Sequence, residues 1–166
     1  KIDWGWLSLN PNAIKLLSSN LNKINWGYLS LNPNAIELLT NNQDKIDWYW
    51  LSCNPNAIKL LSSNLNKINW MWLSRNPNAI ELLTKNQDKI DWNNLSCNSN
   101  AIELLTKNQD KIDFLYSSRN PCIFDKLTWS PLTHKFFLDK EKIIQFYCNT
   151  LLCRDITLYI LSFYTE

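Results

Sequence analysis

Valine is absent from this chain of 166 residues, and glycine occurs only twice. A β-sheet protein draws on β-branched residues for its strands and on glycine for its tight turns. These two shortages therefore argue against a sheet and favour a helical fold. Hydrophobic residues nevertheless make up 45% of the chain, which is enough to bury a continuous core.

Long apolar runs and an excess of one charge are also missing. No stretch approaches the roughly 20 apolar residues that a membrane span needs, and the opening Lys1-Ile2-Asp3-Trp4 does not look like a signal peptide. With 17 basic and 15 acidic residues, the net charge is only +2. The sequence therefore predicts neither a membrane nor a nucleic acid as partner.

Metal ligands and nucleophiles do not occur in a catalytic pattern. The cysteine count of five is odd and fits a reducing compartment. The single histidine, His134, has Cys122, Cys148 and Cys153 in the same segment, but no Cys-x-x-Cys pair accompanies it. We expect no metal, no cofactor and no enzymatic activity.

What the chain does have is a repeat of 22 residues. The phrase Lys-Ile-Asp/Asn-Trp begins five near-identical units at Lys1, Lys23, Lys45, Lys67 and Lys89, and a sixth, degenerate unit begins at Lys111. Alternate units also share their endings, which gives a longer period of 44 residues. Because Lys1 falls in phase with the repeat, we expect further units upstream. Positions within a unit are numbered below from Lys1 as position one.

Each unit reads as two short helices. Asp3 is a good N-cap for a first helix that carries Trp4 and Leu7 on one face. Asn10 is expected to end that helix in left-handed geometry and to cap the next, where Pro11 takes the first helical position. Ala13, Ile14 and Leu17 supply the apolar stripe of the second helix, and Asn20 is placed to stop it.

Such a hairpin is too small to bury its own apolar face, so neighbouring hairpins must stack. We predict an all-α protein, a right-handed or gently curved α-solenoid over 1–120. The competing fold is a leucine-rich repeat, whose period also includes 22. It needs an apolar residue before its asparagine, where this chain has Arg75 in one unit, and the prolines after that asparagine suit a helix start better.

The pattern dissolves after about residue 119, and residues 121–166 are predicted to form a helical C-terminal cap. Helical spacing recurs over 139–149 and 154–164. As an alternative, residues 152–163 look like the opening helix of an F-box, an adaptor motif. Cys153 stands where that family prefers proline, and the chain reaches Glu166 before a full F-box would finish.

The repeats resemble the asparagine-rich 22-residue repeat proteins of giant, amoeba-infecting DNA viruses of the mimivirus type. The shared motif is Lys-Ile-Asp-Trp-x-x-Leu-Ser-x-Asn-Pro-Asn-Ala-Ile-x-Leu-Leu, which recurs from residue 1 through about residue 105. The resemblance implies a viral protein of the host cytoplasm or the virion, similar in style to ankyrin-type interaction arrays. It implies no catalytic residues and names no partner.

Position six is the candidate binding site. It carries an aromatic residue in all but the fifth unit, where Asn94 interrupts it, and lies about 200° around the helix from position four. The sequence leaves two interpretations open, an exposed surface for a partner or packing between hairpins. We call this set the aromatic row: Trp6, Tyr28, Trp50, Trp72 and Tyr116.

Other columns have structural interpretations. The tryptophans at position four (Trp4, Trp26, Trp48, Trp70 and Trp92) are expected to stack in the core. The lysines at position one are expected to pair with neighbouring aspartates on a solvated edge, and the asparagines to cap helices and turns. Positions five and nine vary within otherwise constant surroundings, which fits either free drift or tuning towards a partner.

The sequence thus predicts a non-catalytic scaffold that binds a protein of the host or the virus. Self-association into a virion component or a filament is the first alternative, and an F-box-like adaptor is the second.

Overall fold

The described part of the computed structural model comprises residues 2–112, 116 and 120. The chain divides into two compact units, Lys1–Ile123 and Phe124–Glu166. The predicted cap over 121–166, with its F-box-like segment and with Cys122, His134, Cys148 and Cys153, lies outside the described residues.

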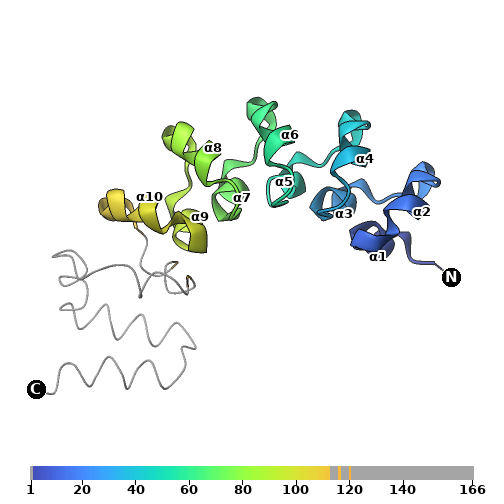
Figure 1. Ribbon diagram of the computed structural model, residues 1–166, viewed down its shortest axis with the longest axis horizontal. Helices are drawn as coiled ribbons and strands as arrows, with labels where there is room; N and C mark the ends of the chain where they lie inside the picture. Colours follow the sequence, from blue (N-terminus) through green and yellow to red (C-terminus); the bar gives the residue numbers. More distant parts are fainter. Residues whose placement is uncertain (1, 113–115, 117–119, 121–166) are drawn as a thin grey trace, which may run out of the picture. The chain divides into compact units, whose positions relative to one another are not determined.

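The prediction of an all-helical repeat fold is confirmed over the described residues, in which no strand occurs. Helices alternate between two rows along the repeats (Figure 1). The first row contains α1 (Trp4–Leu9), α3 (Trp26–Leu31), α5 (Trp48–Leu51), α7 (Trp70–Arg75) and α9 (Trp92–Ser96). The second contains α2 (Ile14–Ser18), α4 (Ile36–Thr40), α6 (Ile58–Ser62), α8 (Ile80–Lys85) and α10 (Ile102–Lys107).

Short 3₁₀ turns link the two rows. They lie at Leu21–Lys23, Gln43–Lys45, Leu65–Lys67, Gln87–Lys89 and Gln109–Lys111, and two more, Pro11–Ala13 and Ser99–Ala101, lead into α2 and α10. Helices of four to six residues are too short to be stable alone. In the first row α1 packs on α3, α3 on α5 and α7 on α9, so the fold depends on stacking.

The predicted caps are largely confirmed. Asp3 Oδ1 accepts hydrogen bonds from the backbone N–H groups of Gly5 and Trp6, and Asn10 Oδ1 accepts one from Asn12 N–H. Asn20 Nδ2 donates to Leu16 O near the end of α2. The left-handed geometry expected of Asn10 is wrong, because its φ is −76° and its ψ is 119°, an extended conformation.

The core consists of aliphatic side chains instead of the predicted tryptophans. The leucines at position seventeen, such as Leu39, are fully buried, together with the position-seven leucines from Leu29 onward and the position-thirteen alanines from Ala35 onward. All five position-four tryptophans are only half-buried. In the first-row helices from α3 to α9, the leucine three residues after the tryptophan is 0% exposed.

Four of the five position-four tryptophans instead contact a lysine of the next repeat through the face of the ring. The ammonium groups of Lys23, Lys45, Lys67 and Lys111 lie 4.6–5.1 Å from the ring centres of Trp4, Trp26, Trp48 and Trp92. These contacts are cation–π interactions. The predicted pairing of this lysine column with aspartates is wrong, since the ion pairs of the described residues join other lysines to glutamates.

A ladder of buried asparagines at position ten joins successive repeats. In each case Nδ2 donates to two backbone carbonyls of the preceding repeat at 2.9–3.1 Å. Asn54, for example, is 0% exposed and bonds Ser30 O and Asn32 O. We call this set the asparagine ladder: Asn32, Asn54, Asn76, Asn98 and Asn120.

The position-eight serines form a second buried connection between repeats. Ser30 Oγ donates to Trp26 O at 2.8 Å and accepts from Asp47 N–H of the next repeat at 3.1 Å. Ser8, Ser52 and Ser74 make the equivalent pair of bonds. The serine and asparagine side chains at these positions are therefore buried in the interior of the array, as the leucines are.

Candidate functional site

Four members of the aromatic row lie on first-row helices, each one position before the leucine at position seven and therefore about 100° around the helix from it. Trp6 is 68% exposed and Tyr28 39% exposed, while Trp50, Trp72 and Tyr116 are half-buried. Tyr49 and Met71, at position five, flank the row and are each 40% exposed. These apolar side chains form an accessible patch over four consecutive repeats.

Rings of neighbouring repeats contact one another within the patch. Trp6 and Tyr28 stack with ring centres 6.1 Å apart and planes 30° apart, and Trp50 and Trp72 lie 6.3 Å apart at 36°. Tyr49 packs edge-on against both Trp50 and Trp72, at 5.0 and 5.5 Å. The two interpretations of position six therefore describe one arrangement, in which the rings pack between hairpins and still present their outer surface.

Position five of one repeat lies beside the position-six ring of the next repeat. A Cβ added at Gly5 would lie 3.5 Å from the Tyr28 ring, and one at Gly27 would lie 3.6 Å from the Trp50 ring, which is ordinary van der Waals contact. The Tyr28 and Trp50 rings thus cover position five of the preceding repeat. Where that position is Tyr49 or Met71, its side chain widens the patch.

Position nine completes the same face, because it lies three residues beyond position six on each helix. Between the third and fourth repeats, Cys53, Trp72, Arg75 and Asn76 line a pocket of about 170 Å³. The Arg75 guanidinium lies 5.8 Å from the centre of the Trp72 ring. Trp72 Nε1 is buried and has no hydrogen-bond partner.

Cys53 contributes an unreactive wall to this pocket. Burial raises the pKa of the Cys53 thiol to about 11, and the positive charge of Arg75 offsets part of that rise. The thiol therefore stays protonated at neutral pH and acts as a small apolar group. The candidate site from the sequence did not include Cys53 or Arg75, and the available signal was the variation of position nine.

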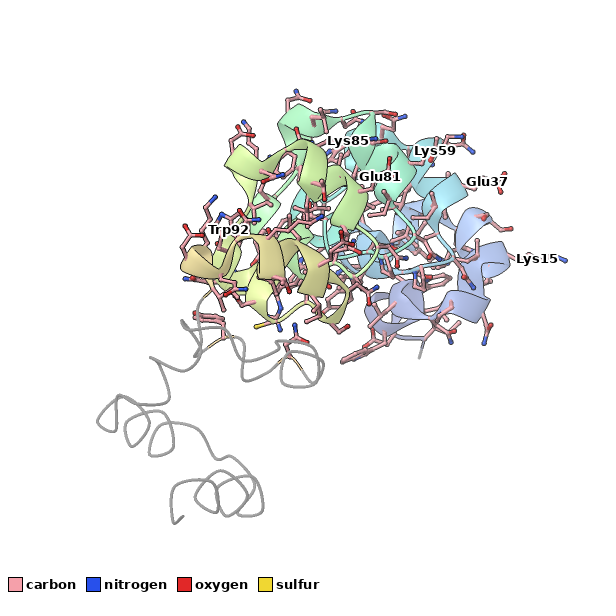
Figure 2. The ribbon with its side chains drawn as sticks, turned by 60° about the vertical axis from the view of Figure 1, so that its left-hand side comes forward. Lys15, Glu37, Lys59, Glu81, Lys85 and Trp92 are labelled. Carbon is pink, nitrogen blue, oxygen red and sulfur yellow. The ribbon has the colours of Figure 1, made fainter. Side chains whose placement is uncertain are left out.

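Charged side chains gather on the second row of helices instead. Lys15 and Glu37 point outward from that row (Figure 2). Ion pairs join Glu81 to Lys85 at 2.6 Å and Glu103 to Lys107 at 2.7 Å. A hydrogen bond from each lysine lowers the pKa of its glutamate partner. This surface is charged, whereas the face that carries the aromatic row is mainly apolar.

Within residues 2–112, 116 and 120, no three histidine, cysteine, aspartate or glutamate side chains gather where they could hold a metal ion. No helix in the described ranges is long and apolar enough to cross a membrane. Comparison with models of protein families, with curated proteins and with solved structures gives no match.

Proposed function

We propose that this chain is a non-catalytic repeat scaffold that binds a protein partner through the aromatic row. The observation that supports the proposal is a patch of exposed and half-buried aromatic and methionine side chains on four consecutive repeats, from Trp6 to Trp72. Large apolar patches on a protein surface usually mark interaction sites, and tryptophan and tyrosine dominate the binding energy of such sites.

The fold adds a physical reason for tight binding. The asparagine ladder fixes each repeat to its predecessor, and the stacked rings restrict one another. Binding therefore orders few side chains that were free before, so less conformational entropy is lost. A partner that lies across several repeats could contact several aromatic side chains at once.

The test compares selection from a phage-displayed library of random peptides on two triple variants. Trp6→Ala/Trp50→Ala/Trp72→Ala removes three rings of the row, and we expect enrichment to fall by at least about tenfold. The matched control, Leu16→Ala/Leu21→Ala/Leu65→Ala, truncates three exposed leucines outside the row and should enrich like the unmodified chain. Equal enrichment by both variants, each helical by circular dichroism, would remove the row as a binding site.

The resemblance to giant-virus repeat proteins leads us to propose that the partner is a host or viral protein, met in the host cytoplasm or the virion. Self-association is separated from this function by light scattering. Particles that grow with concentration would favour assembly, and a monomer at all concentrations would favour the scaffold.

A further inference from the structure

We infer that the pocket between Cys53 and Arg75 binds the carboxylate of an aspartate or glutamate side chain of the partner. The preferred partner segment would then place apolar side chains on the aromatic row and an acidic side chain in this pocket. The inference rests on the proposed function and adds to it the chemistry of the partner.

Arg75 is the first reason for a carboxylate. It is exposed and forms no ion pair with any described residue. It is also the sole charged residue at positions five, six and nine of the five regular repeats, since the equivalent residues of Arg75 are Leu9, Leu31, Cys53 and Cys97. A charge introduced into an apolar column of an otherwise constant repeat creates a local site for an anion.

The guanidinium is also held in place. It lies over the Trp72 ring, where the cation–π interaction orients its planar fork of donors before a ligand arrives. The carboxylate of Asp47, in the repeat that contributes Cys53 to the pocket, is engaged at the start of α5, where Oδ1 accepts from the backbone N–H groups of Tyr49 and Trp50.

The shape and charge of the pocket supply the second reason. A carboxylate has two oxygens, which can both accept from the planar fork of guanidinium donors. One negative charge also matches the single positive charge of Arg75, and a pocket of about 170 Å³ has room for the group.

The experiment repeats the peptide selection with the full chain and two single variants. The unmodified chain should enrich peptides that combine aromatic or aliphatic residues with a nearby Asp or Glu. Arg75→Leu installs the residue that occupies Leu9 and Leu31, so the fold is retained. This variant should still enrich peptides with aromatic or aliphatic residues, but it should no longer favour peptides with Asp or Glu. Arg75→Glu should favour Lys or Arg at the same place.

A selected peptide then allows a direct measurement. Replacing its acidic residue by the matching amide should weaken binding about tenfold, and this difference should shrink with added salt and disappear in Arg75→Leu. Trp72→Phe keeps an aromatic ring but weakens the cation–π contact that orients Arg75, and it should reduce the preference for acid over amide. A second peptide, the phosphoserine twin, carries phosphoserine in place of the acidic residue and is otherwise identical. It should bind no tighter than the carboxylate peptide.

The outcomes separate the two proposals. Apolar peptides enriched without acidic residues, or an unchanged acidic preference in Arg75→Leu, would overturn the carboxylate pocket and leave the scaffold function standing. Tighter binding of the phosphoserine twin would also overturn it. Loss of the scaffold function would appear differently, as unchanged enrichment when Trp6, Trp50 and Trp72 are replaced together.

Discussion

A single buried asparagine side chain satisfies three backbone groups in this fold. The amide of Asn54 donates to Ser30 O and Asn32 O of the preceding repeat, and its oxygen accepts from Asn56 N–H. Serine or aspartate could cap the turn, but neither carries two N–H donors. The requirement for an amide at this place accounts for asparagine at every position ten.

Asn54→Ala should therefore lower the free energy of unfolding by about 2–5 kcal/mol, because it leaves Ser30 O and Asn56 N–H without partners and removes one of the two bonds to Asn32 O. Urea denaturation followed by circular dichroism measures the change. Asn66→Ala is the matched control, since Asn66 is exposed and its loss should change stability by less than about 0.5 kcal/mol. Similar values for the two variants would contradict a structural role for the ladder.

Caps could be predicted from the sequence because they connect residues two or three positions apart. The capping roles of Asp3 and Asn10 follow from the preferences of those residue types, and the structure confirms them. The bonds from Asn54 to the preceding repeat span 22 and 24 residues. Local preferences contain no information on the distance between stacked hairpins, so this second role of the asparagines was missed.

At the scale of the helix, first-row helices are stabilised by cation–π contacts between a position-four tryptophan and a lysine of the next repeat. Position four was wrongly predicted to be core because a helical pattern shows which residues share a face but not how deeply that face is covered. The Lys67 ammonium group lies 4.7 Å from the centre of the Trp48 ring, which is half-exposed. The same contact explains why the lysine column needs no aspartate.

Lys67→Met keeps an unbranched side chain over Trp48 but removes its charge, and we expect it to lower the free energy of unfolding by about 0.5–1 kcal/mol. Lys67→Arg should preserve most of the stability. Lys59→Met provides the comparison, because Lys59 is exposed on α6 and contacts no ring. If the two methionine variants have the same stability in urea, the cation–π contact contributes nothing measurable.

At the scale of the array, the free energy of unfolding is approximately a sum over repeats. Each repeat adds its own contribution and that of its interface with the neighbouring repeat. Deletion of residues 45–88 removes two whole repeats and joins Asp44 to Lys89, which recreates the Asp-Lys junction found at Asp44–Lys45. The shortened chain should keep the helical circular dichroism spectrum per residue of the array and melt at a lower temperature.

Deletion of residues 45–55 is the appropriate control, because it removes half a repeat and puts the two sides out of phase. This variant should lose the cooperative melting transition. If it melts as cooperatively as the in-phase deletion, the 22-residue register does not determine the stacking. The register itself was readable from the sequence, whereas the exposure of the aromatic row depends on which side of each hairpin its neighbour covers.

The interfaces between adjacent repeats are chemically almost interchangeable, since the same asparagine amide, serine hydroxyl and leucine side chains recur at each interface. A unit is therefore complementary to the unit of any neighbour, and only the short tether between adjacent hairpins selects the right one by keeping it close. When two partly unfolded molecules meet, a hairpin of one fits equally well into the gap left in the other. Crowded refolding should thus favour exchange between molecules, and dilution should favour correct order within each one.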